Sequence, residues 1–197
     1  VPLLVQRGDT RAIAYHLFTS GTTGEPKRIS PPDTTLMRFV DWQKERLGPR
    51  PFKTMLLAGL SHDPVMRDIF LPLSSGGAVI VPHEDEIRNP SALRGLIAAE
   101  EPDTLHITPA SGQLIAMGAE PDVAFPSLHF IYWGGDRVEP SRVTEWRGFA
   151  PGARQFNLYG TTETPQAALI HEIADDAGSF RVPNGMHPKG AITGGED

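Results

Sequence analysis

The amino-acid sequence predicts an α/β fold in which a mostly parallel sheet is covered by helices. Short apolar runs alternate with segments of helical periodicity along most of the chain, which is the pattern of βα units. Apolar residues make up 39% of the 197 residues and charged residues 21%, as in globular domains rather than disordered chains. Polar or glycine-rich segments directly follow several apolar runs, where the ligand sites of parallel sheets form.

The expected elements follow one another in regular order. The first apolar run, 13–20, predicts a short strand. Residues 33–48 predict a helix with Asp33 as a candidate N-cap and Gly48 at its end. A second helix, 63–76, has Pro64 in its first turn. The remaining expected strands are 53–59, 77–82, 103–108, 128–135 and 153–160. The remaining expected helices are 90–101, 109–118 and 139–149.

The predicted ligand edge carries three segments that follow strands, at residues 19–24, 134–136 and 160–164. Because the carboxyl ends of parallel strands meet at one edge of a sheet, we expect these segments to gather there. The last residues, 181–197, are rich in Gly and Pro and show no periodicity. We therefore expect one domain core over 1–180, followed by a linker or a truncated continuation at 181–197.

Composition limits the classes of function. The formal net charge is −6, so nothing indicates a nucleic-acid surface. The absence of cysteine excludes disulfides, thiolate catalysis and thiolate metal sites, and it fits a reducing compartment. No apolar run is long enough for a membrane span, and no signal-peptide pattern opens the chain. We expect a cytoplasmic protein without nucleic-acid or membrane partners.

The segment TSGTTGEPK, residues 19–27, has the chemistry of a phosphate-binding loop. The Walker motif is excluded because Lys27 does not directly follow a glycine. Hydroxyl groups, bare backbone amides and one ammonium suit the oxygens of a polyphosphate, although a solvated turn would have the same composition. The residues that would supply these groups are Thr19, Ser20, Gly21, Thr22, Thr23, Gly24 and Lys27.

Three motifs in order resemble the adenylate-forming superfamily, which includes acyl-CoA synthetases, luciferases and the adenylation domains of nonribosomal peptide synthetases. TSGTTGEPK resembles the family's phosphate-binding signature, and NLYGTTET (157–164) resembles its Tyr-Gly-x-Thr-Glu element. WGGD (133–136) resembles its Gly-Gly-Glu segment, with Asp136 in place of Glu. The resemblance covers residues 13–172 and implies the central part of the family's large N-terminal domain, whose enzymes join a carboxylate to the α-phosphorus of ATP and release pyrophosphate.

The resemblance implies ATP and Mg²⁺ as cofactors and assigns roles to single residues. Thr162 matches the phosphate-contacting threonine, Glu163 matches the magnesium ligand, and Lys27 matches a lysine that helps with loop closure and pyrophosphate. Asn157 and Tyr159 match positions that contact and stack on adenine. The full implied nucleotide site is Thr19, Ser20, Gly21, Thr22, Thr23, Gly24, Lys27, Gly135, Asp136, Asn157, Tyr159, Gly160 and Thr162.

The acid substrate is expected to meet the segment that opens the 63–76 helix. By resemblance to peptide-synthetase domains, Asp63 pairs with the α-ammonium of an amino acid, although it could equally cap the helix. Arg67 would favour an acidic or hydrogen-bonding side chain, unless it pairs with Asp68 or another carboxylate on the helix face. The implied pocket wall is Asp63, Pro64, Arg67, His106, Tyr132, Gly134, Leu158, Gln166 and Ala167.

The resemblance leaves the acceptor of the activated acid open. An adenylation domain would pass an amino acid to the phosphopantetheine thiol of a carrier protein. His62, which matches a position in acyl-CoA synthetases, favours an acyl- or aryl-CoA ligase instead, and a hydroxy or keto acid is a further alternative. No segment matches the lysine of the family's small C-terminal subdomain, so we expect that subdomain to lie outside this chain. The chain could then also be a non-catalytic structural subdomain.

Overall fold

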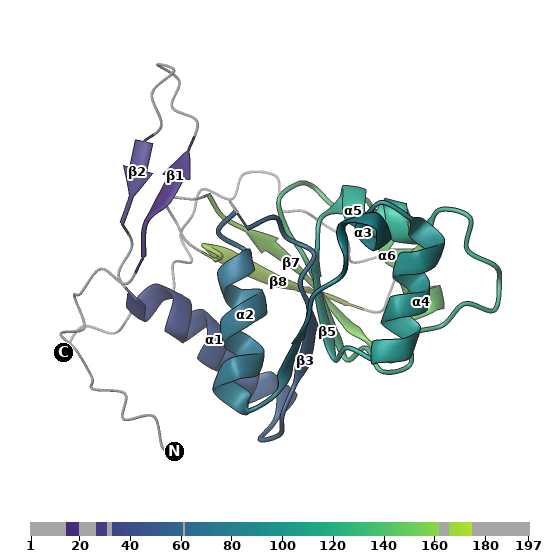
Figure 1. Cartoon of the computed structure of the whole chain (residues 1–197), viewed down its shortest axis with the longest axis horizontal. Helices are drawn as coiled ribbons and strands as arrows, with labels where there is room; N and C mark the ends of the chain where they lie inside the picture. The colour runs from purple at the N-terminus through teal and green to yellow at the C-terminus, as the bar shows by residue number, and fades with distance from the viewer. Residues whose placement is uncertain (1–14, 20–26, 31–32, 61, 162–165, 175–197) are drawn as a thin grey trace.

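A computed structural model describes residues 15–19, 27–30, 33–60, 62–161 and 166–174 (Figure 1). Along this part of the chain the strands are β1 (Leu17–Thr19), β2 (Lys27–Ile29), β3 (Lys53–Met55), β4 (Ala78–Ile80), β5 (Thr104–Ile107), β6 (Phe130–Trp133), β7 (Arg154–Tyr159) and β8 (Leu169–Ile173). The helices are α1 (Asp33–Leu47), α2 (Val65–Ser75), α3 (Glu84–Ile87), α4 (Pro90–Glu100), α5 (Pro109–Ala116) and α6 (Pro140–Phe149). The boundary predicted at residue 180 lies outside the described residues.

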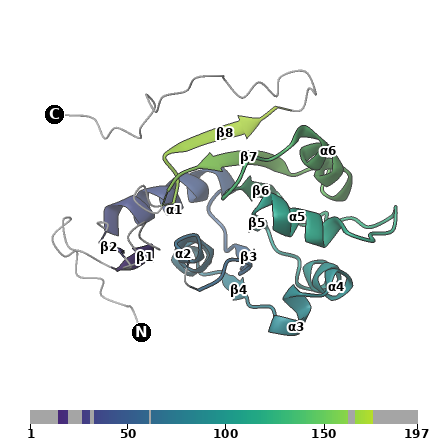
Figure 2. The ribbon, with the colours of Figure 1, turned by 90° about the horizontal axis from the view of Figure 1, so that it is seen from above.

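The main sheet has six strands in the order β4-β3-β5-β6-β7-β8, and it confirms the predicted α/β class. Strands β3 to β7 pair in parallel, whereas β8 runs antiparallel to β7. Each crossover between parallel neighbours passes through at least one helix, as such connections require. In Figure 2 the sheet runs between α1 and α2 on one side and α4, α5 and α6 on the other.

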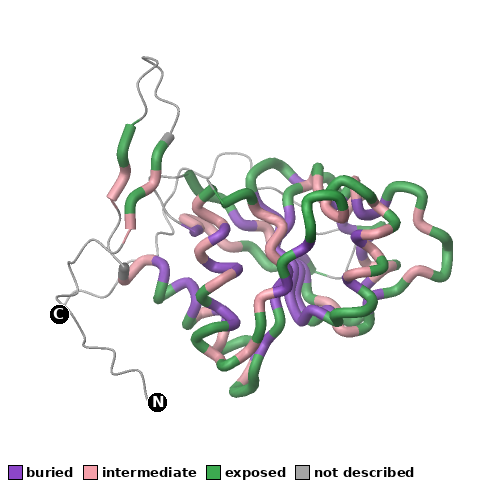
Figure 3. The backbone as a smooth tube through the Cα atoms, in the orientation of Figure 1, coloured by how far each residue is buried: buried purple, intermediate pink, exposed green. Residues whose placement is uncertain are grey.

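Two hydrophobic cores fill the two faces of this sheet. On one face α1 contributes Leu36, Phe39 and Val40, which pack with Tyr132 and Phe156 of the sheet. These helix positions follow the spacing that predicted the helix. The other face holds the larger core, which combines Leu93, Ile97, Ile115, Leu105, Ile131, Trp133 and Trp146. Burial is therefore concentrated in the central strands and the helix sides that face them (Figure 3). Both faces are covered, as a parallel sheet requires.

The helix ends follow the local sequence. Gly48 takes φ +84° directly after α1, and its N–H bonds to the Lys44 carbonyl at 3.0 Å, so this glycine ends the helix as predicted. Thr108 caps α5, because its hydroxyl accepts from the Ser111 N–H at 3.1 Å. Asp33 is the first helical residue of α1 rather than the residue before it.

The strand expected over 13–20 is not part of the main sheet. Leu17–Thr19 pairs antiparallel with Lys27–Ile29 in a separate two-stranded sheet, and Thr19 lies opposite Lys27. A partner strand that follows this closely can pair only as a hairpin, since a parallel partner needs a crossover of a dozen or more residues. The expectation that residues 19–24 follow a strand of the main sheet was therefore wrong. Residues 20–24 lie outside the described part of the chain.

Candidate functional site at the carboxyl edge of the sheet

Strands β5, β6 and β7 end side by side, with Ile107 opposite Trp133 and Trp133 opposite Asn157. The segment 134–136 follows β6 directly and bends at Gly135, which has φ +84°. A Cβ on Gly135 would lie 3.2 Å from the Thr108 methyl group, so this segment lies against the start of α5. The carboxyl edge thus carries the segment 134–136 and the described start, Gly160 and Thr161, of the segment 160–164.

The residues implied for the adenine side lie at this edge. Asn157 is half-buried, and the Tyr159 side chain is 63% exposed and available to a flat ligand. Asp136 is exposed, and its carboxylate accepts from the Arg137 N–H at 2.7 Å. Gly160 is exposed where β7 ends. These positions suit a nucleotide, whose base and ribose would find an aromatic face, an amide and a carboxylate there.

The predicted phosphate and metal residues are only partly described. Lys27 lies in β2 and is exposed. Ser20, Gly21, Thr22, Thr23, Gly24, Thr162 and Glu163 lie outside the described residues, and the Thr19 side chain does too. Within the described ranges, no group of three or more His, Cys, Asp or Glu residues could hold a metal ion. The described part of the chain also contains no helix that is long and apolar enough to cross a bilayer.

The predicted pocket wall is built on the sheet face beneath α1 and α2. His106 of β5 lies opposite Tyr132 of β6 in the register, and the two rings stack with centroids 4.8 Å apart. Tyr132 lies opposite Phe156 of β7, two residues before Leu158. Tyr132 is fully buried, and burial raises the pKa of its hydroxyl far above the usual range. These side chains lie side by side on one face of the sheet and are held in place because they belong to adjacent parallel strands.

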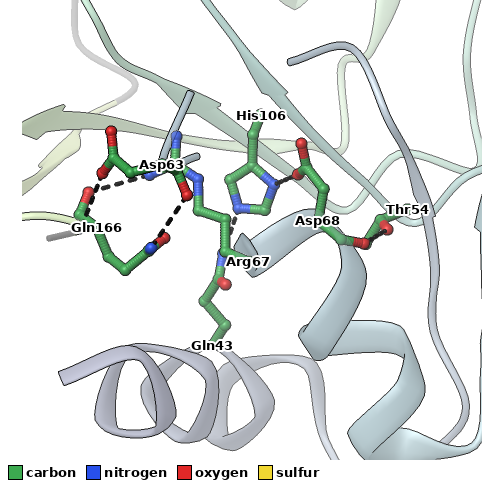
Figure 4. A network of polar contacts seen from close by, with 7 residues as sticks. All are labelled: Gln43, Thr54, Asp63, Arg67, Asp68, His106 and Gln166. Atoms are coloured by element: carbon green, nitrogen blue, oxygen red, sulfur yellow. Dashed lines mark hydrogen bonds and ion pairs between the residues drawn. The ribbon is translucent and has the colours of Figure 1, made fainter. Parts of the chain in front are cut away.

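Asp63, Arg67 and Gln166 form a substrate-side cluster at the start of α2 (Figure 4). The Gln166 side-chain amide donates to the Asp63 carbonyl at 3.2 Å, and the Gln166 carbonyl accepts from Arg67 Nη1 at 3.0 Å. Among the described residues, the Asp63 carboxylate accepts one bond, a long one of 3.4 Å from the Gln166 N–H. Gln166 has φ 74°, a strained value for a residue other than glycine and one that recurs at functional sites.

Asp63 does not cap α2. The capping position is Pro64, and no side-chain oxygen accepts from the first turn of this helix. The alternative interpretation of Asp63 as a helix cap was therefore wrong. Its half-buried carboxylate lies beside the Gln166 backbone N–H instead (Figure 4).

Arg67 is buried, with 4% of its surface exposed. Its guanidinium lies above the Phe39 ring, and a Cβ on Gly134 would lie 3.7 Å from Nη2. In the described part of the chain no carboxylate forms an ion pair with it, and Nε has no hydrogen-bond partner. Burial lowers the pKa of Arg67, while the charges of Asp68 and Asp63 act against this shift. The alternative that Arg67 pairs with Asp68 on a helix face was wrong.

Asp68 instead belongs to a histidine network with His106 and Gln43. His106 Nδ1 lies 2.5 Å from the Asp68 carboxylate, and His106 Nε2 lies 2.6 Å from the Gln43 amide nitrogen. All three residues are buried. Burial lowers the pKa of His106, although the adjacent Asp68 carboxylate raises it in part. The network joins α1, α2 and β5 beside the substrate-side cluster (Figure 4).

Gln43 and Asp68 were not among the site residues expected from the sequence, although each is a polar residue at an apolar position of a helical pattern. Gln43 stands among Leu36, Phe39, Val40 and Leu47 at helical spacing, and Asp68 falls between Val65 and Leu71 in the same way. A polar residue on an apolar helix face must find a buried partner. The sequence could therefore indicate that partners exist, but it could not identify His106 as the partner of both.

Buried polar atoms without a partner gather around these two groups. Most of those in the described residues belong to, or adjoin, the substrate-side cluster and the histidine network: Tyr15 Oη, Gln43 Oε1, Arg67 Nε, Asp68 Oδ2, Tyr132 Oη and Gln166 Oε1. Some of these residues adjoin one another, since Tyr132 meets Gln43 and Tyr15 meets Gln166. Ala167, the last predicted wall residue, is half-buried beside them, whereas His62 is exposed to solvent.

A mostly parallel sheet whose carboxyl edge carries glycine and polar residues is the arrangement in which α/β enzymes bind nucleotides. The chain belongs to the AMP-binding enzyme family, whose family model matches residues 3–187. The match includes every predicted site residue.

Several known proteins are similar to this chain in sequence or in structure. The L-2-aminoadipate reductase large subunit of Penicillium chrysogenum is 35% identical over 170 residues, which is 86% of this chain and 12% of that protein. Phenyloxazoline synthase MbtB of Mycobacterium tuberculosis is 37% identical over 172 residues, again 86% of this chain and 12% of that protein. The solved nonribosomal peptide synthetase FmoA3 in its AMPPNP-bound form superposes with a TM-score of 0.76 at 26% identity, over 85% of this chain and 18% of that one. The chain thus spans about an eighth of the curated relatives it matches, and its fold is that of an adenylation-domain core.

Proposed function

We propose that this chain is the central part of an adenylation domain that activates an α-amino acid with ATP. A carboxylate oxygen of the amino acid attacks the α-phosphorus of ATP, the bond from that phosphorus to the bridging oxygen breaks, and pyrophosphate leaves. The product is an aminoacyl-adenylate. The observation that carries the amino-acid assignment is the Asp63 carboxylate, which does not cap α2 and accepts a long bond from the Gln166 N–H. An ammonium group would supply the strong donor that this carboxylate lacks among the described residues.

The residues at the carboxyl edge support the nucleotide part of the proposal. Asn157, Tyr159 and Asp136 would hold the adenosine, and Lys27 would meet the phosphates together with the segment 19–24. Mg²⁺ would be held by Glu163, and when bound it would offset the charge that grows on the phosphate oxygens. Thr162 would donate to the α-phosphate. In the protein, these residues bind and orient ATP so that its α-phosphorus faces the acid.

The side chain of the substrate would meet Arg67. A buried guanidinium without a carboxylate partner favours a ligand that carries a carboxylate or another hydrogen-bond acceptor. One relative is by name a reductase of L-2-aminoadipate, an amino acid that has a second carboxylate. The acceptor of the adenylate would be the phosphopantetheine thiol of a carrier protein. The acyl-CoA ligase alternative loses support because His62 is solvent-exposed and outside the pocket.

The test compares Asp63→Ala with the unmodified full-length enzyme on paired substrates. Pyrophosphate exchange would be measured with an amino acid and with its amine-free analogue of the same carbon skeleton. We expect kcat/KM for the amino acid to fall about 10- to 100-fold, since hydrogen bonds to charged groups contribute about 1.5–3 kcal/mol. The amine-free acid should change little. An equal loss for both substrates would remove Asp63 from ammonium binding, and a preference of the unmodified enzyme for the amine-free acid would indicate a hydroxy or keto acid.

A further inference from the structure

The structure gives His106 a different task from the direct substrate contact that its pocket position suggests. Both ring nitrogens already have partners inside the protein, Asp68 on one side and Gln43 on the other. One ring face stacks on Tyr132. A ring held on two edges and one face by the protein has no nitrogen left for a ligand.

The partners also determine which nitrogen carries the proton. The Gln43 amide nitrogen only donates, so it requires a lone pair on His106 Nε2. The proton of the neutral ring is then on Nδ1, where the Asp68 carboxylate accepts it. The groups that face the ring are Gln43 from α1, Arg67 and Asp68 from α2, and Tyr132 from β6. A second proton on the ring would require the Gln43 amide to turn its oxygen toward Nε2.

Asp68 is adjacent to Arg67 in sequence, and both side chains are buried. Successive side chains of a helix diverge. The charge of Asp68 still acts on Arg67, but the Asp68 carboxylate bonds to His106 while Arg67 bonds to the Gln166 carbonyl. The Thr54 hydroxyl donates to the Asp68 carbonyl at 2.6 Å and fixes this turn of α2 on β3. The geometry therefore separates the two charges.

We infer that Gln43, Asp68 and His106 are positioning residues for substrate selection, which hold the Asp68 carboxylate away from Arg67 and so leave the guanidinium available to a carboxylate on the substrate side chain. This inference rests on the proposed function. It assigns His106 no contact with the substrate. Selection for the acidic side chain comes from Arg67, and the histidine network keeps the Asp68 carboxylate from pairing with that guanidinium.

The main test measures side-chain selection in the full-length enzyme. Pyrophosphate exchange with glutamate and with glutamine, which has nearly the same shape, yields a ratio of kcat/KM values. In His106→Leu the Asp68 carboxylate loses its partner and can turn to Arg67, so the glutamate-to-glutamine ratio should fall on the order of tenfold. Asp68→Asn combined with His106→Leu removes the competing charge and should restore the ratio. Asp68→Asn alone should equal or exceed the unmodified ratio.

Asp103→Asn is the matched control. Asp103 is also buried and paired, with Arg50 at 2.6 Å, but it lies just before β5, at the opposite end of the strand from the carboxyl edge. Its loss should reduce stability and leave the ratio unchanged. An unchanged ratio in a folded His106→Leu variant would overturn the inference, as would a double variant that fails to restore it.

A spectroscopic measurement tests the network without relying on activity. In protein with ¹⁵N-labelled histidine, the His106 signals are those that disappear in His106→Gln. We expect the neutral ring with its proton on Nδ1 at pH 7. Gln43→Glu places an acceptor opposite Nε2 and should convert the ring to the doubly protonated form at the same pH. A proton on Nε2 in the unmodified protein would overturn the inference. An enzyme that activates no amino acid would instead refute the proposed function.

Discussion

Replacing Arg67 with methionine would separate the charge of this side chain from its packing, because methionine fills similar space beside Phe39 without a charge. We expect kcat/KM for glutamate or 2-aminoadipate to fall about 10- to 100-fold, since a hydrogen bond between charged groups contributes about 1.5–3 kcal/mol and each 1.36 kcal/mol is a factor of ten. Alanine, which offers no side-chain acceptor, should be activated with less than about a threefold change.

The same change should have little effect on folding. The variant loses the 3.0 Å bond from Arg67 Nη1 to the Gln166 carbonyl, which costs stability. It also removes a buried cation that has no carboxylate partner in the described part of the chain, which favours the folded state. The two effects oppose each other, so we expect the free energy of unfolding to change by less than about 2 kcal/mol.

The assay is pyrophosphate exchange with each amino acid in turn, accompanied by urea unfolding. Arg94→Met is the control, because Arg94 also donates to backbone carbonyls, those of Ile115, Met117 and Gly118, away from the site. It should lower stability without changing the relative rates for glutamate and alanine. Equal losses for glutamate and alanine in Arg67→Met would refute the assignment of Arg67 to the substrate side chain.

Three further predictions concern packing, pH and the metal. Gly112→Ala should destabilise the domain by about 1–3 kcal/mol in urea unfolding, since its Cβ would lie 2.6 Å from the Trp133 ring, whereas Gly95→Ala in open space on α4 should be neutral or stabilising. Burial lowers the pKa of His106, so the unfolded chain takes up the proton more readily and the free energy of unfolding should decrease as pH falls below about 6.5. His106→Gln should flatten that pH dependence, and an identical profile would contradict the explanation. Glu163→Ala should abolish magnesium-dependent adenylation, and near-normal turnover at saturating Mg²⁺ would exclude Glu163 as the metal ligand.

The sequence predicted the parallel core well because each of its elements has a local signal. Strand β6 is a continuous apolar run, and β5 contains the apolar residues Leu105 and Ile107. Helices α1 and α4 show helical spacing, with Gly48 directly after α1 and Asn89 directly before α4. Strand β8 was missed. It is only partly buried, and its pairing with β7 is a contact between neighbouring strands that no motif marks.

The sequence named residues that the structure brings close together, but it did not predict the contacts between them. Resemblance proposed Asp63, Arg67, His106 and Gln166 as neighbours of the substrate, which stays a prediction. It could not show that His106 has no free nitrogen or that Asp68 bonds to it, because partners separated by 38 positions depend on how α2 packs on the sheet. Buried hydrogen bonds of this kind follow from tertiary structure, whereas periodicity reports only which face is buried.

The reversal of direction between β7 and β8 has a consequence for engineering the enzyme. Tyr159 pairs with Leu169, so the connection 160–168 leaves the sheet and returns to it at the same edge. That single stretch carries Gln166, which holds Arg67 and Asp63, and also the predicted phosphate and metal residues Thr162 and Glu163. A substitution at Gln166 made to retune substrate preference therefore falls only three positions after Glu163 in the same connection. Residues assigned to substrate selection and residues assigned to ATP lie in one short connection. A designer who wants to change substrate selection alone should therefore begin on α2.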